Sequence, residues 1–157
     1  MKKTIKTEQV FEAFNILKGA KSTNLSTEER IKVWKISRIL APIAERMEAD
    51  GKDAAEKFKE GFENFDERVA KAQEYMAKSK DKNVDAKSLP MGAAEFEAFK
   101  EGDWKAYSLI LKKALDEFAQ KEVEVVFEPI SENILVKLME SNDWTFEYLN
   151  ILDFLTK

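Results

Sequence analysis

Apolar residues near the N-terminus recur at the spacing of an amphipathic helix. Val10, Phe14 and Leu17 lie four and three residues apart, so their side chains share one face of a helix. Thr7 stands where an N-cap is needed, and Gly19 marks the expected end. The pattern therefore predicts a helix from about residue 7 to residue 18.

The clearest helix start follows at Ser26. The Ser-Thr-Glu-Glu run over 26–29 is a capping box, in which the Ser26 hydroxyl and the Glu29 carboxylate each satisfy a backbone N–H. One apolar face continues from Val33 to Met47, with Pro42 inside it as an expected kink. Gly51 is the natural end of this helix, although the pattern leaves open one long helix that continues through it.

The apolar residues of 53–79 form the most regular repeat in the chain. Their spacing is the a/d pattern of a helix that packs along another helix, and they are Phe58, Phe62, Phe65, Val69, Ala72 and Met76. We expect this helix to fold back on the preceding one at Gly51, which gives an antiparallel hairpin. An intramolecular core seam is favoured over a self-dimerising coiled coil, because the repeat is short.

Periodicity stops over residues 79–92, where polar and charged residues predict a solvated, mobile linker. Residues 93–101 are then expected to form a short helix that ends at Gly102, and Asp103 is expected to cap the next one. Ser131 begins another short helix, and the aromatic-rich tail 144–155 is expected to be helical.

The period changes to two residues over 122–128. The Glu-Val-Glu-Val-Val-Phe-Glu run alternates, is rich in valine and ends before Pro129, which is typical of a strand. A lone strand would leave its backbone groups unpaired, and the one other suitable segment is 2–6. The sequence thus predicts a single, mainly α domain over 1–157, with a helical hairpin or bundle and a two-stranded sheet made from both ends. The direction of the strands stays open.

Composition narrows the chemistry that the protein can perform. The 157 residues include no histidine and no cysteine, which excludes disulfides, cysteine nucleophiles, histidine bases, and zinc or haem held by either residue. Carboxylate, lysine and tyrosine chemistry remains, together with Mg²⁺ held by carboxylates. No apolar run is long enough to span a bilayer, and no hydrophobic segment follows the N-terminal lysines. We therefore expect a cytoplasmic protein without a membrane partner.

Charge is distributed unevenly along the chain. Residues 1–43 carry nine basic and four acidic side chains, whereas residues 122–157 carry two and eight. We expect the basic part to pack beside the acidic part, and the alternative is head-to-tail contact between copies or with a partner. Few of the basic residues are arginine, so nucleic acid is not the expected partner, and a small nucleic-acid-binding regulator is a further alternative.

The two ends of the chain share a recognisable order of elements. Thr7-Glu8-Gln9-Val10-Phe11 opens a helix directly after a short strand, and Lys121-Glu122-Val123-Glu124-Val125 leads into Pro129-Ile130-Ser131. This order resembles a family of small uncharacterised bacteriophage and prophage proteins, which pair an N-terminal strand–helix with a C-terminal "EVEV" strand. The resemblance implies a viral origin and a role near particle assembly, and it implies no catalytic or binding residues.

One carboxylate pattern points to an enzyme instead. Glu45 and Glu48 form an ExxE motif, and Glu63 and Asp66 form an ExxD motif, which look similar to the Mg²⁺-binding motifs of all-α nucleotide pyrophosphohydrolases. In a hairpin that turns at Gly51, however, the two pairs are offset by roughly 9 Å along the helix, at 1.5 Å per residue. That offset is too large to share one ion. A solvated acidic face is therefore favoured, and a Mg²⁺-dependent hydrolase is the alternative.

Apolar residues outside the main helix faces are candidate contacts with a partner. Ile31 and Trp34 lie off the apolar face of the second helix, and Trp144 and Phe154 belong to the aromatic tail. Aromatic residues are enriched at interface hot spots. We therefore expect a non-enzymatic phage or prophage structural, assembly or accessory protein without a cofactor. It would act through a protein partner or self-association, in the cytoplasm or in a virion.

Overall fold

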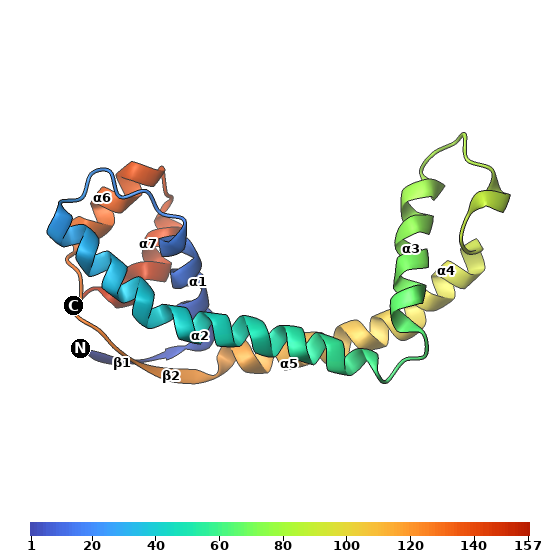
Figure 1. Ribbon diagram of the computed structural model, residues 1–157, viewed down its shortest axis with the longest axis horizontal. Helices are drawn as coiled ribbons and strands as arrows, with labels where there is room; N and C mark the ends of the chain where they lie inside the picture. The colour runs from blue at the N-terminus through green and yellow to red at the C-terminus, as the bar shows by residue number, and fades with distance from the viewer. The chain divides into compact units, whose positions relative to one another are not determined.

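The computed structural model describes residues 1–157, and the chain is mainly helical (Figure 1). The α-helices are α1 (Thr7–Lys18), α2 (Thr27–Lys59), α3 (Phe65–Ser79), α4 (Ala93–Phe99), α5 (Lys105–Gln120), α6 (Glu132–Asn142) and α7 (Phe146–Leu152). The strands β1 (Lys2–Lys6) and β2 (Glu122–Val126) form one antiparallel sheet. The predicted fold class, mainly α with a small sheet made from the N-terminal and a late segment, is confirmed.

The packing divides the chain into two compact units. Unit 1 contains Met1–Asp50 and Glu117–Lys157, and unit 2 contains Gly51–Asp116. Each unit has a hydrophobic core of its own. Unit 1 is therefore built from both ends of the chain, and unit 2 is one continuous segment.

The sheet of unit 1 has one buried and one exposed face. Ile5 and Val125 are almost completely buried on the inner face, as expected when alternate residues of a strand face the core. On the outer face the Lys2 ammonium lies 2.8 Å from a Glu124 carboxylate oxygen. β1 runs directly into α1, and the Thr7 hydroxyl donates a hydrogen bond to the Lys121 carbonyl at 2.6 Å. Thr7 is thus the first helical residue, not the predicted N-cap, which is Lys6.

The predicted capping box at the start of α2 is confirmed. The Ser26 N–H donates to the Glu29 carboxylate at 2.8 Å, and the Glu29 N–H donates to the Ser26 hydroxyl at 3.3 Å. Glu29 also accepts hydrogen bonds from Lys137 of α6 at 2.7 and 3.0 Å. A weaker ion pair joins Lys32 to Glu128 at 3.8 Å. The basic N-terminal and acidic C-terminal parts of the chain therefore pack together within unit 1.

The favoured turn at Gly51 is wrong, because α2 continues through Pro42 and Gly51 to Lys59. The alternative that the pattern left open, one long helix through Gly51, is the one that the structure shows. A side-chain β-carbon at Gly51 would lie 3.2 Å from the Leu115 Cδ2 atom of α5. The glycine therefore makes room for a neighbouring helix, and it does not end its own. The chain turns at residues 60–64, where Asn64 adopts a left-handed conformation with φ of 49°, and α3 then runs across the direction of the end of α2 (Figure 1).

The turn at residues 60–64 also divides the predicted repeat of residues 53–79. Phe58 lies in α2, Phe62 in the turn and Phe65 at the start of α3, so the repeat does not follow one continuous helix. Phe65 is nonetheless buried in the unit 2 core, and Phe58 and Phe62 pack against it. The predicted core is thus formed, but by two helices and the turn between them.

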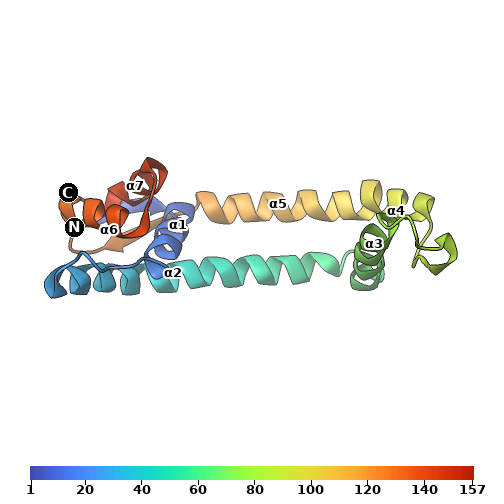
Figure 2. The same cartoon turned by 90° about the horizontal axis from the view of Figure 1, so that it is seen from above.

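An antiparallel helix pair does form in unit 2, between α2 and α5. The Tyr107 hydroxyl donates to the Ala55 carbonyl at 3.0 Å, and Leu115 lies beside Gly51. Residues that come later in α2 therefore meet residues that come earlier in α5. Figure 2 shows the end of α2 and the start of α5 running in opposite directions.

The remaining elements follow the predictions with smaller differences. β2 ends at Val126, two residues before the predicted limit, and the tail forms α7 followed by a 3₁₀ turn over Asp153–Leu155. Residues 79–92 contain only the short 3₁₀ turn Ala86–Ser88. Met91, at the end of that segment, is buried in the unit 2 core.

Candidate protein-binding site

The candidate site lies in unit 2, where α3 faces α4. Val69, Ala72 and Met76 are three and four residues apart along α3, so they present one apolar stripe. Opposite them, Phe96 of α4 stacks on Tyr75 with ring centroids 4.6 Å apart. The two helices thus meet through apolar and aromatic side chains, which position the walls of the site.

A kink at Gly102, in the segment Lys100–Trp104 between α4 and α5, shapes the second wall. Gly102 has a non-helical backbone there, with φ of −97° and ψ of −105°. This kink changes the direction of the chain between Phe99 and Trp104, so the two side chains are not related by the regular rotation of one helix. Phe99 and Trp104 consequently lie together, with ring centroids 6.3 Å apart. The predicted interruption of the helix at Gly102 is therefore confirmed. The Asp103 carboxylate accepts a hydrogen bond from Arg68, and its predicted role as a helix cap stays a prediction.

Phe65 is the centre of the aromatic cluster behind the site. Its ring is stacked on Trp104 at 6.2 Å with an interplanar angle of 9°, and its centroid lies 4.5 Å from that of Tyr107. Such aromatic pairs add roughly 0.5–1.5 kcal/mol each beyond the burial of their area. The cluster therefore gives the apolar walls a rigid support.

Arg68 connects α3 to the residues on both sides of the kink at Gly102. One guanidinium nitrogen donates to Asp103 at 2.6 Å, and the guanidinium carbon lies 4.8 Å from the centroid of the Phe99 ring. The same nitrogen also donates to the Glu63 carbonyl at 3.3 Å. Arg68 therefore holds the ring of Phe99, one of the residues that line the site.

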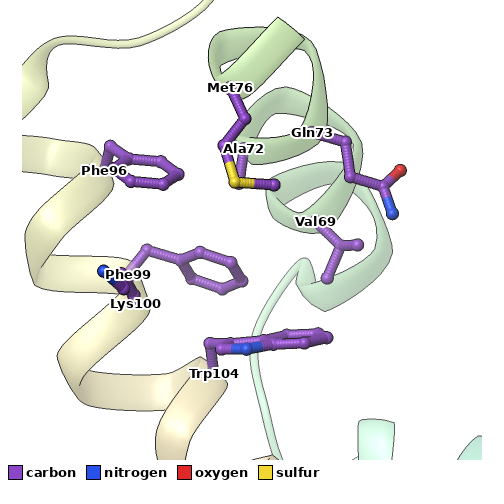
Figure 3. A pocket seen from close by; sticks show the side chains of 8 residues that line it. All are labelled: Val69, Ala72, Gln73, Met76, Phe96, Phe99, Lys100 and Trp104. Carbon is purple, nitrogen blue, oxygen red and sulfur yellow. The ribbon is translucent and has the colours of Figure 1, made fainter.

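Between these walls lies an open cavity of about 200 Å³, which we call the unit 2 groove. Its lining residues are Val69, Ala72, Gln73, Met76, Phe96, Phe99, Lys100 and Trp104. Phe96, Phe99, Met76 and Trp104 point toward one another across the space, and the amide of Gln73 points away from it (Figure 3). Met76 and Trp104 are 48% and 41% exposed, so a partner can reach the apolar walls.

The groove is suited to binding and not to acid–base chemistry. Lys100 is its one charged lining residue, and no carboxylate, hydroxyl or phenol lines it. Its volume is below the roughly 300–1,000 Å³ that is usual for small-molecule sites. It is large enough for one apolar group, since a dry cavity of about 150 Å³ holds benzene. The arrangement therefore favours one large apolar side chain as the ligand.

The carboxylates of the metal alternative are divided between the two units. Glu45 and Glu48 belong to α2 in unit 1, whereas Glu63 lies in the 60–64 turn and Asp66 in the first turn of α3. The Asp66 carboxylate is 3.0 Å from the Lys59 ammonium. No group of three or more acidic side chains is arranged to hold a metal ion.

Lys59 connects the end of α2 to the start of α3. Its ammonium is 2.8 Å from Glu56 and 3.0 Å from Asp66. These two hydrogen bonds, first to Glu56 and then to Asp66, raise the pKa of the Lys59 ammonium above its ordinary value. Asp66 therefore serves as a partner of this lysine at the 60–64 turn.

The four predicted partner-binding residues fall into two groups, all in unit 1. Ile31 and Trp34 are 45% and 55% exposed, and the guanidinium of Arg38 lies over the Trp34 ring at 4.9 Å. Trp144 and Phe154 instead pack against the unit 1 core, where Phe154 meets Phe127 edge to face at 6.3 Å. Ile31 and Trp34 are thus accessible, and the two tail residues contribute to the core.

The groove itself was not predicted from the sequence. Phe96, Phe99 and Trp104 are aromatic residues on both sides of Gly102, and this spacing is the signal that could have indicated it. The interruption at Gly102 was predicted, but the convergence of Phe99 and Trp104 on Phe65 depends on tertiary packing, for which the sequence has no reliable pattern.

Comparison of the chain with protein-family models, with curated proteins and with solved structures finds no match. None of the helices combines the length and the apolar character that crossing a membrane requires.

Proposed function

We propose that the protein is non-enzymatic and acts by binding another protein at the unit 2 groove. The observation that supports this best is the open, apolar cavity between α3 and α4, with Met76 and Trp104 exposed at its margin. Exposed apolar walls of this kind are typical of protein-binding surfaces. The groove has no group that could act as a nucleophile or general base, apart from the lysine at its side.

The partner that fits is an amphipathic helix with one large apolar anchor residue. Helices bind grooves between two helices through such anchors, and the flexible side chain of Met76 can adapt to their shape. Lys100 favours an acidic residue beside the anchor, because it is the one charge that lines the groove. The resemblance of both chain ends to phage and prophage proteins supports a partner from the phage particle or from its assembly.

The test is affinity capture from the native host lysate with matched variants. Met76→Lys adds a charge to the groove, and we expect it to weaken capture of the partner by about 30-fold or more, the effect of a hot spot worth roughly 2 kcal/mol. Leu109→Lys is the control, because Leu109 is an exposed residue of unit 2 that does not line the groove. It should leave capture unchanged.

Two results would contradict the proposal. In the first, the wild-type protein captures no partner. In the second, Met76→Lys and Leu109→Lys reduce capture equally, which would show that the groove is not the binding surface. A Mg²⁺-dependent hydrolase and a nucleic-acid-binding regulator are the alternative functions, and no feature of the groove favours either of them.

A further inference from the structure

The backbone hydrogen bonds at the two ends of the sheet show which residues of β1 and β2 form hydrogen-bonded pairs. Met1 and Phe127 exchange two backbone hydrogen bonds, at 2.7 and 2.9 Å, and the Thr7 N–H donates to the Lys121 carbonyl at 2.8 Å. In an antiparallel pair, hydrogen-bonded and non-hydrogen-bonded residue pairs alternate. The register that pairs Lys3 with Val125 therefore places the odd-numbered residues of both strands in hydrogen-bonded pairs.

The even-numbered residues consequently point their backbone groups away from the partner strand. On β1 these residues are Lys2, Thr4 and Lys6, and on β2 they are Glu122, Glu124 and Val126. No third strand pairs with either edge. In the view of Figure 1, no helix of unit 1 is drawn beyond β2. Unpaired strand edges of this kind are templates for pairing with another chain.

The two free edges carry opposite charges. Lys2 and Lys6 are exposed on the β1 edge, and Glu122 and Glu124 are exposed on the β2 edge. Pairing two β1 edges would place lysine beside lysine, and pairing two β2 edges would place glutamate beside glutamate. Like charges opposite each other destabilise a strand pair, and opposite charges stabilise it. The only favourable contact between copies thus joins a β1 edge to a β2 edge.

We infer that the β2 edge of one copy binds the β1 edge of a second copy, which extends the sheet. In the register of the existing pair, Lys6 of the second copy lies opposite Glu122, and Thr4 of the second copy lies opposite Glu124. The same pairs, Lys6 with Glu122 and Thr4 with Glu124, already lie opposite each other within one chain. On the same face, Lys2 also reaches Glu124 diagonally at 2.8 Å. This inference does not depend on the unit 2 groove.

The contact is head-to-tail and therefore leaves one free edge of each kind at the two ends of an assembly. Such heterologous contacts build open chains unless the rotation between copies closes a ring. The charged pairs are exposed, with side-chain exposures of 61% and 62% for Lys2 and Glu124, so salt screens them. High salt should weaken the association without abolishing it, because the backbone hydrogen bonds remain.

The test uses one proline variant for each edge. Thr4→Pro removes an outward N–H from the β1 edge, and Val126→Pro removes one from the β2 edge. Proline is tolerated where the N–H of an edge strand faces solvent. In sedimentation velocity, the wild type should show species that grow with concentration, and each variant alone should stay monomeric. An equimolar mixture should form a heterodimer and nothing larger, because each variant keeps the edge that the other lacks.

Further variants keep the test decisive if a proline variant does not fold, which circular dichroism would reveal. Val126→Lys keeps every backbone donor and places a lysine opposite Lys2 of the second copy, so it should weaken association without abolishing it. Val136→Lys on α6, equally a change of an exposed valine, should have no effect. A wild type that is monomeric at every concentration would overturn the inference. So would oligomers that form as readily in all three edge variants as in the wild type. Met76→Lys should leave the oligomers intact, which separates this inference from the groove.

Discussion

Arg68 illustrates how single side chains stabilise the candidate site. It is half-buried, bonds to Asp103 and lies over the ring of Phe99. A partly exposed ion pair contributes about 0.2–1 kcal/mol, and a cation–π contact at an exposed site contributes about 0.5–1 kcal/mol. The two contacts act on one guanidinium, so a single substitution removes both.

Arg68→Ala should lower the free energy of unfolding by about 0.7–2 kcal/mol, the sum of these two contributions. The measurement is urea unfolding followed by the fluorescence of Trp104, which lies beside Phe99. Lys71→Ala is the control, because it removes only an exposed i,i+4 pair with Glu67. A loss no larger than that of Lys71→Ala would mean that Arg68 does not hold the site together.

At the scale of elements, α2 shows that a glycine in a sequence can either end a helix or lie inside one. A glycine often ends a helix, but Gly51 lies inside α2 and beside Leu115. Leu115 is 39% exposed, so its side chain can move by the few tenths of an ångström that a methyl group requires. The conformational cost of a glycine in a helix then decides how Gly51→Ala changes the free energy of unfolding.

Gly51→Ala should raise the free energy of unfolding by up to about 0.5–1 kcal/mol, because alanine is favoured over glycine inside a helix by that amount. Thermal unfolding by circular dichroism measures the change. Ala49→Gly, two residues earlier in the same helix, should give a loss of similar size. If Gly51→Ala instead destabilised the protein strongly, the side chain of Leu115 would not move aside for the added methyl group.

The start of α2 should make stability depend on pH. The hydrogen bond from Lys137, followed by the bond from the Ser26 N–H, lowers the pKa of Glu29 below its ordinary value of 4.5. Because the folded pKa is lowered, the stabilisation is present above pH 4.5 and is lost as the pH falls through the folded pKa.

Glu29→Gln should therefore reduce stability at neutral pH and flatten its fall in the acid range. Unfolding midpoints measured from neutral pH down to the acid limit of folding would show this. Glu28→Gln removes the same formal charge from the neighbouring exposed position and is the control. Parallel curves for the wild type and Glu29→Gln would contradict the assignment.

At the scale of the whole molecule, the chain order makes unit 2 an insertion in unit 1. All core residues of unit 1 lie in 1–50 and 117–157, and those of unit 2 lie in 58–111. Asp50 and Phe118, next to the two connections, line the same cavity. The two ends that excision of unit 2 would leave are therefore close together.

Replacing residues 51–116 by a short Gly-Ser linker should leave unit 1 folded, because a compact unit with its own core can fold alone. Trp34 and Trp144 would report its unfolding by fluorescence, since both lie in unit 1. We expect a single cooperative transition in urea. A gradual, uncooperative transition would show that unit 1 needs residues 51–116 to fold.

Local sequence patterns were sufficient to predict most helices and strands of this protein. Two features depend only on neighbours in sequence: the capping box at Ser26 and Glu29, and the alternation of 122–128. The need of that strand for a partner depends on backbone pairing alone. These features are readable because helix periodicity, cap chemistry and strand alternation act over a few residues. The strand direction followed only from the register that the structure adopts.

The features that form the unit 2 groove were decided by tertiary contacts. The same glycine chemistry that predicted a turn at Gly51 serves close packing against Leu115, because a helix can retain a glycine when a neighbour fills the space. The convergence of Phe99 and Trp104 depends on the kink at Gly102 and on the packing of both rings against Phe65 of α3. The sequence by itself therefore determined the helices, the sheet and the absent chemistries. Only the tertiary structure decided where the chain turns and which aromatic side chains form the groove, since both depend on contacts between distant residues.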